Sequence, residues 1–258
     1  MCRAARKDHF LILLELQSSF NVSSFTMSIV LPGDPIEVKA TLGPGIYQVP
    51  LSSARPSVAG VLETRQKRGT EIVYIDSNSR RYVPSLKDNV VGVVIGKHSE
   101  GYRVQLQDHS PPVRLDQFAF ENATKKNKPN LALGALVYGR ISVAERDIEA
   151  EMECFDATTG KSGGFGELKG GNVFNVSLGY ARKLLFEGSP VLNEIGQRVP
   201  YEIAIGMNGK VWVDAPDMVA VLKICRCIQQ AESMASDEAV KNVAKVFQSS
   251  SSTSANSS

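Results

Sequence analysis

The chain has 258 residues, enough for two or three domains of roughly 100 residues each. With 43% hydrophobic and 22% charged residues, its composition is that of a globular protein and excludes a fibrous or wholly disordered one. The formal net charge is only +2, so a polyanion site has to arise from locally segregated charge. The four cysteines and three histidines have no zinc-site spacing. We therefore expect reduced thiols in an intracellular protein, without metal or cofactor.

The two ends are expected to lie outside the folded domains. Residues 1–26 place basic residues before an apolar run at 10–16, which contains Glu15 and is too short to span a bilayer. The run also lacks a signal-peptide cleavage pattern. We expect these residues to be a disordered or mis-assigned extension, with Met27 as the working start and no membrane partner. The Ser-rich tail at 249–258 is expected to be disordered.

Residues 27–87 predict a β-rich N-terminal domain. Glycine and proline interrupt this segment at short intervals, as in 32–35 and 42–47, which favours hairpins over helices. Its lysines and arginines outnumber its acids by eight to five, and much of this charge lies at expected turns. Solubilising turn charge explains that excess at least as well as a binding role.

Residues 88–166 predict a five-stranded barrel of the OB type. The expected strands are short apolar or alternating runs at 90–96, 102–107, 112–120, 136–143 and 148–155. Short β-rich runs separated by turn residues are typical of a sandwich or barrel. OB barrels of this size bind oligonucleotides through one face and its loops. Single-stranded nucleic acid is therefore the first partner to test.

Charge is segregated along this predicted barrel. Residues 97–140 hold seven lysines and arginines against four acids, a balance of +3, whereas residues 145–156 hold one arginine against six acids, a balance of −5. Because the acidic strand would repel phosphates, we expect RNA to pass a lysine-rich loop at 125–128. Such a loop, taken alone, is more often a solvated surface; the barrel context favours binding.

The candidate RNA-binding residues are basic side chains and one aromatic ring: Lys97, Tyr102, Arg103, Lys125, Lys126, Lys128 and Arg140. Tyr102, Phe118, Phe120 and Tyr138 are candidate platforms on which unpaired bases stack. Most of these rings are expected to fill the barrel interior instead. Tyr102, beside Arg103 after a Ser-Glu-Gly turn, is the ring that we expect to be exposed.

Residues 167–248 predict an α+β domain of the KH type. We expect a strand at 173–177, helices at 178–186 and 190–195, strands at 201–205 and 210–214, and helices at 216–231 and 237–247. The order strand, helix, helix, strand, strand, helix is that of a KH domain. The whole chain is thus of mixed class: a β-rich N-terminal domain, an OB barrel and a KH domain.

Gly206-Met-Asn-Gly209 matches the G-x-x-G loop with which KH domains clamp RNA. That loop normally joins two helices, whereas this one is expected to join two strands, and Asn-Gly is the strongest signal of a type I′ hairpin. We therefore assign a structural role to Gly206, Asn208, Gly209 and Trp212, and expect a positive φ at Gly209.

No catalytic motif is present in the sequence. Residues 158–162 superficially resemble a phosphate-binding loop, but Phe155 occupies the position of its first glycine. No nucleophile, zinc-protease or paired-carboxylate constellation appears either. We expect the protein not to be an enzyme.

Five segments together carry a family resemblance: 42–47 (LGPGIY), 74–76 (YID) with 81–84 (RYVP), 153–156 (ECFD) and 206–213 (GMNGKVWV). With them the chain resembles the ribosomal RNA-processing protein 40 family of RNA exosome cap subunits, over roughly residues 27–247. The resemblance implies an N-terminal domain, an S1-type OB domain and a KH domain in this order, with the G-x-N-G turn packed between the last two.

The resemblance further implies a non-catalytic subunit, active in rRNA processing and RNA degradation. Such caps lie with other cap subunits on a ring of ribonuclease-PH-like subunits, guide single-stranded RNA into its pore, and leave 3′–5′ degradation to associated hydrolytic ribonucleases. The lysine loop would face the pore entrance. The expected location is the nucleus and nucleolus, and also the cytoplasm.

Two alternatives stay open at this point: the sibling S1/KH cap subunit of the same complex, and a free-standing RNA-binding protein acting in translation. A polynucleotide phosphorylase is excluded, because its KH domain precedes its S1 domain and two catalytic domains precede both.

Overall fold

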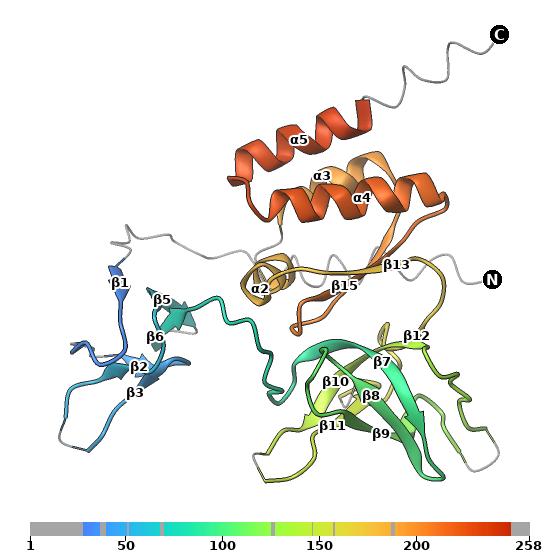
Figure 1. The fold of residues 1–258 in the computed structure, drawn as a ribbon, viewed down its shortest axis with the longest axis horizontal. Coiled ribbons are helices and arrows are strands. Elements are labelled where there is room, and N and C mark those ends of the chain that lie inside the picture. Colours follow the sequence, from blue (N-terminus) through green and yellow to red (C-terminus); the bar gives the residue numbers. More distant parts are fainter. Residues whose placement is uncertain are drawn as a thin grey trace. The chain divides into compact units, whose positions relative to one another are not determined.

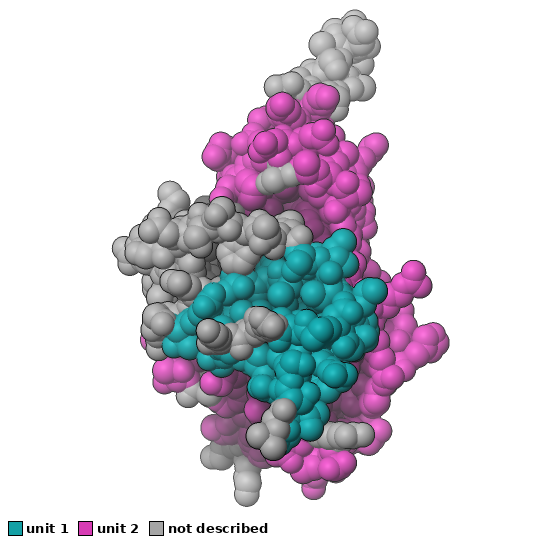
Figure 2. Space-filling view, turned by 90° about the vertical axis from the view of Figure 1, so that its left-hand side faces the viewer, with its two compact units in different colours: residues 1–77 teal, residues 78–258 magenta. Residues whose placement is uncertain are grey.

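The computed structural model describes residues 28–36, 40–50, 52–67, 70–124, 127–145, 147–156, 158–186 and 189–248. The chain divides into two compact units, residues 1–77 and residues 78–258, which Figure 2 colours separately. The extension expected at 1–26 and the tail expected at 249–258 lie outside the described residues. Among the helices that are described, none has both the length and the apolar character that crossing a membrane requires.

The first unit is built from strands. One sheet has the order β1-β5-β6-β2, formed by β1 (Ser28–Val30), β5 (Gly60–Lys67), β6 (Thr70–Asp76) and β2 (Thr41–Leu42). A separate pair joins β3 (Ile46–Tyr47) to β4 (Arg55–Pro56). Strands β5 and β6 form an antiparallel hairpin, while β2 pairs with β6 in parallel. The β-rich N-terminal region predicted from glycine and proline spacing is confirmed.

The second unit begins with the five-stranded barrel that the sequence predicts (Figure 1). Strand β7 (Asn89–Lys97) pairs with β8 (Gly101–Gln105), β8 with β9 (Val113–Phe120), and β9 with β11 (Glu151–Cys154). Strand β10 (Leu136–Val143) pairs with both β11 and β7 and so closes the barrel. A further strand, β12 (Gly166–Leu168), pairs with one end of β10 and is not predicted by the sequence.

The barrel closes around alternate residues of its strands. Along β9, for example, Val113, Leu115 and Gln117 are buried, and the residues between them are more exposed. Burying every second side chain of each strand fills the interior of a small barrel. The buried set from the other strands includes Val90, Val94, Tyr102, Val104, Val137, Ile141, Met152 and Cys154.

The KH region follows in the predicted order. It comprises β13 (Asn172–Asn175), α2 (Leu178–Phe186), α3 (Pro190–Arg198), β14 (Glu202–Ile205), β15 (Lys210–Asp214), α4 (Met218–Ala231) and α5 (Ser236–Gln248). The sheet has the order β13-β15-β14, and the helices share one hydrophobic core with it. Asp217 precedes helix α4 and caps it, because its side chain accepts a hydrogen bond from the backbone N–H of Val219.

Candidate nucleic-acid interface

The turn at 206–209 joins the KH sheet to the barrel. The side chain of Asn208 is 1% exposed and makes three hydrogen bonds to barrel backbone. Its Nδ2 donates to the carbonyl oxygens of Val91 (2.8 Å) and Leu106 (2.7 Å), and its Oδ1 accepts from the N–H of Val91 (3.3 Å). The Met207 N–H adds a bond to the carbonyl of Asn89, at 2.7 Å. The Asn208 amide and the Met207 N–H are therefore committed to the backbone of the barrel.

Both glycines of this turn are required by its geometry. A Cβ at Gly206 would lie 2.1 Å from Oδ1 of Asn208, so any side chain there would displace the buried amide. Gly209 has a φ of +80°, as the Asn-Gly pattern predicts, and a Cβ there would lie 2.6 Å from the carbonyl oxygen of Val176.

Trp212 completes the junction between the barrel and the KH region. The indole is 4% exposed and belongs to a small buried cluster with Val91 of the barrel and Ala204 of the KH sheet. Its Nε1 donates to the carbonyl oxygen of Gly170, at 2.9 Å. Trp212 thus lies at this junction, and Gly206, Asn208 and Gly209 lie in the turn that forms it.

Tyr102 is buried, contrary to the prediction that its ring is exposed. Its side chain is 2% exposed inside the barrel, and its hydroxyl donates to the carbonyl of Pro129 (2.5 Å) and accepts from the N–H of Leu131 (3.3 Å). These two bonds satisfy the hydroxyl and allow the ring to be buried. Tyr102 therefore offers no surface on which a base could stack, but it fixes the path of the segment that follows the lysine loop.

Phe118 is the exposed aromatic ring of the barrel. It is 48% exposed on β9, because the alternation that buries Val113, Leu115 and Gln117 directs residue 118 outward. The Nζ atom of Lys128 lies over this ring, 5.4 Å from its centroid. An exposed ring beside a lysine can stack an unpaired base while the ammonium group pairs with the adjacent phosphate.

Lys97 lies at the end of β7, close to the same segment. Its Nζ donates to Oδ1 of Asn130 and lies 5.9 Å from the centroid of the Tyr102 ring. The segment 128–131 therefore lies next to both aromatic rings: Lys128 contacts Phe118 of β9, and Pro129 and Leu131 bind the hydroxyl of Tyr102 of β8. We call Phe118, Lys97 and Lys128 the aromatic–lysine patch. Lys125 and Lys126, two further predicted RNA-binding residues, lie outside the described residues.

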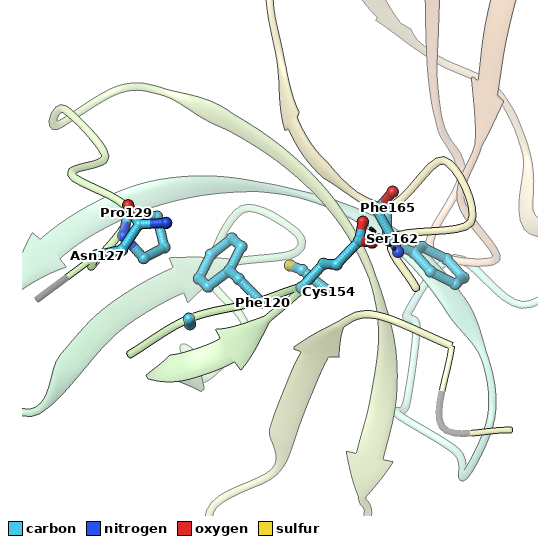
Figure 3. Close-up of a pocket in the computed structure, with 8 residues that line it drawn as sticks. Phe120, Asn127, Pro129, Cys154, Ser162 and Phe165 are labelled. Carbon is cyan, nitrogen blue, oxygen red and sulfur yellow. Dashed lines mark hydrogen bonds between the residues drawn. The ribbon is translucent and has the colours of Figure 1, made fainter. Parts of the chain in front are cut away.

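A pocket of about 250 Å³ opens between two loops of the barrel (Figure 3). The β9–β10 connection contributes Glu121, Asn127 and Pro129, and the β11–β12 connection contributes Ser162 and Phe165. Phe120 and Cys154, at the ends of β9 and β11, also line it. We call it the inter-loop pocket. Burial raises the pKa of the Cys154 thiol well above its usual range, which disfavours the nucleophilic thiolate form.

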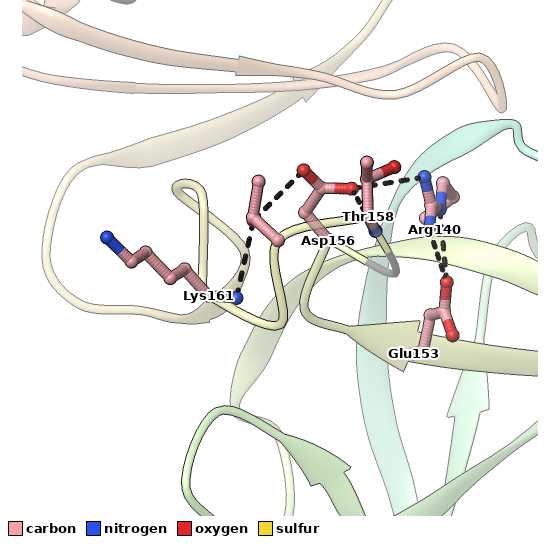
Figure 4. Close-up of polar contacts among 6 residues, drawn as sticks. Arg140, Glu153, Asp156, Thr158 and Lys161 are labelled. Atoms are coloured by element: carbon pink, nitrogen blue, oxygen red, sulfur yellow. Dashed lines mark hydrogen bonds and ion pairs between the residues drawn. The ribbon is translucent and has the colours of Figure 1, made fainter.

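Arg140, predicted to contact RNA, is committed to an ion pair inside the protein (Figure 4). Its guanidinium donates twice to Oε1 of Glu153, at 2.6 and 3.1 Å, and lies 3.8 Å from the carboxylate of Asp156. Residues 140 and 153 face each other across β10 and β11, and their side chains are 19% and 15% exposed. This arginine stabilises the barrel wall, and its charge is largely neutralised.

The strand predicted to be an acidic face is balanced by arginines. Arg103 lies 3.7 Å from Glu149, and Arg114 lies 3.9 Å from Glu151, so two further glutamates of the segment have basic neighbours. Arg103 is 49% exposed and remains accessible to solvent. These ion pairs therefore offset part of the negative charge that the sequence places on this segment.

Three family models cover most of the described chain. The S1 domain of exosome complex component RRP40 matches residues 82–166, a KH domain matches residues 171–218, and the N-terminal domain named for exosome complex exonuclease Rrp40 matches residues 41–81. Exosome complex component RRP40 of Saccharomyces cerevisiae is 43% identical over 226 residues, which span 84% of this chain and 94% of that protein.

The chain belongs to the exosome complex component RRP40 family. The Schizosaccharomyces pombe member is 41% identical across 78% of this chain and 83% of its own length. Exosome complex component Rrp4 of Thermoplasma volcanium is only 25% identical, across 73% of this chain and 76% of that protein. A crystal structure described as that of a "putative exosome complex RNA-binding protein" has a TM-score of 0.50 at 16% identity, covering 65% of this chain and 97% of that one, and shows the shared fold.

Proposed function

We propose that this protein is a non-catalytic, RNA-binding cap subunit of the RNA exosome. The observation that carries the RNA-binding part is the aromatic–lysine patch, in which the half-exposed Phe118 ring lies under the Lys128 ammonium group. Membership of the RRP40 family carries the exosome part, because the curated relatives are exosome complex components by name. Greater identity to RRP40 than to Rrp4 favours this subunit over its sibling.

RNA is bound in single-stranded form, because a duplex keeps its bases paired and stacked and so unavailable to the Phe118 ring. The lysines supply two or three phosphate contacts, and several acids of the barrel stay exposed beside them. Affinity for the isolated chain is therefore modest and sensitive to salt. When the protein is assembled with other cap subunits on a ring of ribonuclease-PH-like subunits, the patch guides RNA toward associated hydrolytic 3′–5′ ribonucleases. The protein acts in rRNA processing and RNA turnover in the nucleus, nucleolus and cytoplasm.

The RNA-binding part is tested by fluorescence anisotropy of a labelled single-stranded RNA titrated with the full chain. We expect saturable binding that weakens about tenfold between 50 and 200 mM salt, since two or three lysines displace counterions. The same sequence as a duplex should bind more weakly. A chain that binds neither form, or binds both equally, would contradict the proposal.

The absence of catalysis is tested in the same samples. Labelled RNA incubated with the full chain, magnesium and inorganic phosphate should stay full length on a denaturing gel. Release of nucleoside diphosphates or monophosphates that scales with the chain's concentration would show an enzyme.

A further inference from the structure

We propose that the inter-loop pocket is a subsite for one unpaired RNA base, and that it prefers bases carrying an amino group to uracil. The inference rests on the proposed RNA binding and adds base discrimination to it. The pocket adjoins the aromatic–lysine patch, because the β9–β10 connection carries both Lys128 and the pocket residues Asn127 and Pro129.

The size and walls of the pocket suit a nucleobase. Its volume of about 250 Å³ is below the range of roughly 300–1,000 Å³ typical of sites for drug-sized ligands, so it accepts one planar ring system. Phe120 and Phe165 contribute aromatic surface, and Cys154 and Pro129 contribute further nonpolar contact (Figure 3). Stacking against such walls is available to every base and supplies affinity without selection.

The polar groups of the pocket supply the selection. The Asn127 amide offers both a donor and an acceptor, as the edge of a base requires. Glu121 accepts a hydrogen bond from the backbone N–H of Ser162 through Oε2, at 2.8 Å, which ties the two loops together. A carboxylate accepts several hydrogen bonds, so Glu121 can accept a further N–H from a base.

Glu121 is kept ionised in this position. The Ser162 N–H, and more weakly the charge of Lys161, hold the pKa of its carboxyl below the usual range. An ionised carboxylate accepts hydrogen bonds and does not donate them. Adenine and cytosine present an exocyclic amine to it, and guanine presents adjacent N–H groups. Uracil presents one N–H flanked by two carbonyl oxygens, which the carboxylate repels.

The charges around the pocket agree with an RNA ligand. Lys161 is exposed and close enough to act on Glu121, and Lys128 follows Asn127 by one residue. Figure 4 shows the backbone of the Lys161 loop fixed by Asp156, which hydrogen-bonds Thr158. These lysines can neutralise the phosphates next to a bound base, while Glu121 and Asn127 offer hydrogen bonds to its edge.

The test is the ratio of affinities for A8 and U8 single-stranded RNA, measured by anisotropy with the full chain at fixed salt. The informative variant is Glu121→Gln, which keeps the size and an acceptor for Ser162 but removes the negative charge. Its matched control is Glu145→Gln, which removes the same charge from an exposed position that does not line the pocket. We expect wild type to bind A8 several-fold more tightly than U8, and E145Q to keep that ratio.

In E121Q the ratio should fall to near one, chiefly through a gain in U8 affinity. Asn127→Ala should weaken A8 binding about tenfold, the value of one well-placed pair of hydrogen bonds to a base, and weaken U8 less. Both substitutions are at exposed positions, so unchanged Trp212 fluorescence and melting temperature will show that the fold is retained.

An A8-to-U8 ratio in E121Q equal to that in E145Q would overturn the base subsite and leave RNA binding intact. A wild-type chain that binds no oligonucleotide would overturn the proposed function together with the subsite. The two failures are therefore distinguishable in one set of titrations.

Discussion

Replacing Asn208 by alanine should weaken the junction between the barrel and the KH region. The substitution removes three hydrogen bonds from a side chain that is 1% exposed, and it leaves two barrel carbonyls and one N–H without that partner. At about 1 kcal/mol for each net hydrogen bond, the expected loss is about 3 kcal/mol, rising toward 4 because the stranded groups remain buried.

The assay is urea unfolding followed by the fluorescence of Trp212, the single tryptophan, which is 4% exposed at the same junction. With a slope of about 2–3 kcal/mol per molar urea, Asn208→Ala should lower the midpoint by about 1–2 M. Asn193→Ala, at an exposed position of α3, is the matched control and should leave the midpoint unchanged. A midpoint for N208A within about 0.2 M of wild type would refute the role of this amide.

An Asn208→Asp variant should also lose stability, by an amount that depends on pH. Its carboxylate would face the carbonyl oxygens of Val91 and Leu106, so burial and these dipoles raise the folded-state pKa of the new acid above its unfolded value. The folded state is more stable when this buried carboxyl is protonated than when it is ionised. The stability of N208D should therefore rise as the pH falls through the folded pKa, whereas the loss in N208A should be constant. A pH-independent difference between the two variants would contradict this account.

Three further predictions follow from the geometry. Gly209→Val should cost about 2–4 kcal/mol, because its φ of +80° and a backbone oxygen 2.6 Å from the new Cβ both oppose a branched residue; an unchanged melting temperature would contradict it. Phe118→Ala should weaken single-stranded RNA binding about tenfold by loss of stacking, whereas Ile148→Ala, also exposed, should not; equal effects in the anisotropy titration would argue against a stacking platform. Arg140→Ala should cost about 2 kcal/mol in urea unfolding, and Arg103→Ala, whose ion pair is longer and half-exposed, under about 0.5; the reverse order would mean that burial does not set these values.

The regular elements were largely predictable because each follows a local period. The alternating run at 136–143 became β10 with the same bounds, and the helical spacing at 178–186 became α2. Helix α3 extends to Arg198, three residues beyond the predicted end. Packing of the helix on the KH core stabilises it past Gly196, a residue that disfavours helix. Strand β12 was missed, since three residues including a glycine carry no period of their own.

The site was less predictable, for two physical reasons. The alternation along β8 and β9 places Tyr102 inward and Phe118 outward, but the polar turn beside Tyr102 favours exposure and so conflicts with this period in the sequence. The pairing of Arg140 with Glu153 depends on the register between β10 and β11, which no local pattern specifies. The inter-loop pocket likewise joins two loops that are distant in sequence, so it exists only in the folded barrel.

The central claim, that this chain is a cap subunit of an exosome, is tested most directly by identifying the proteins that bind it in the cell. The full chain, tagged and expressed at its normal level, should be purified under mild conditions and its partners quantified by mass spectrometry. The account predicts a stoichiometric set of ribonuclease-PH-like ring subunits, with other cap subunits and a hydrolytic ribonuclease. Recovery of the chain alone, or with ribosomes in place of that ring, would keep the fold and contradict the function.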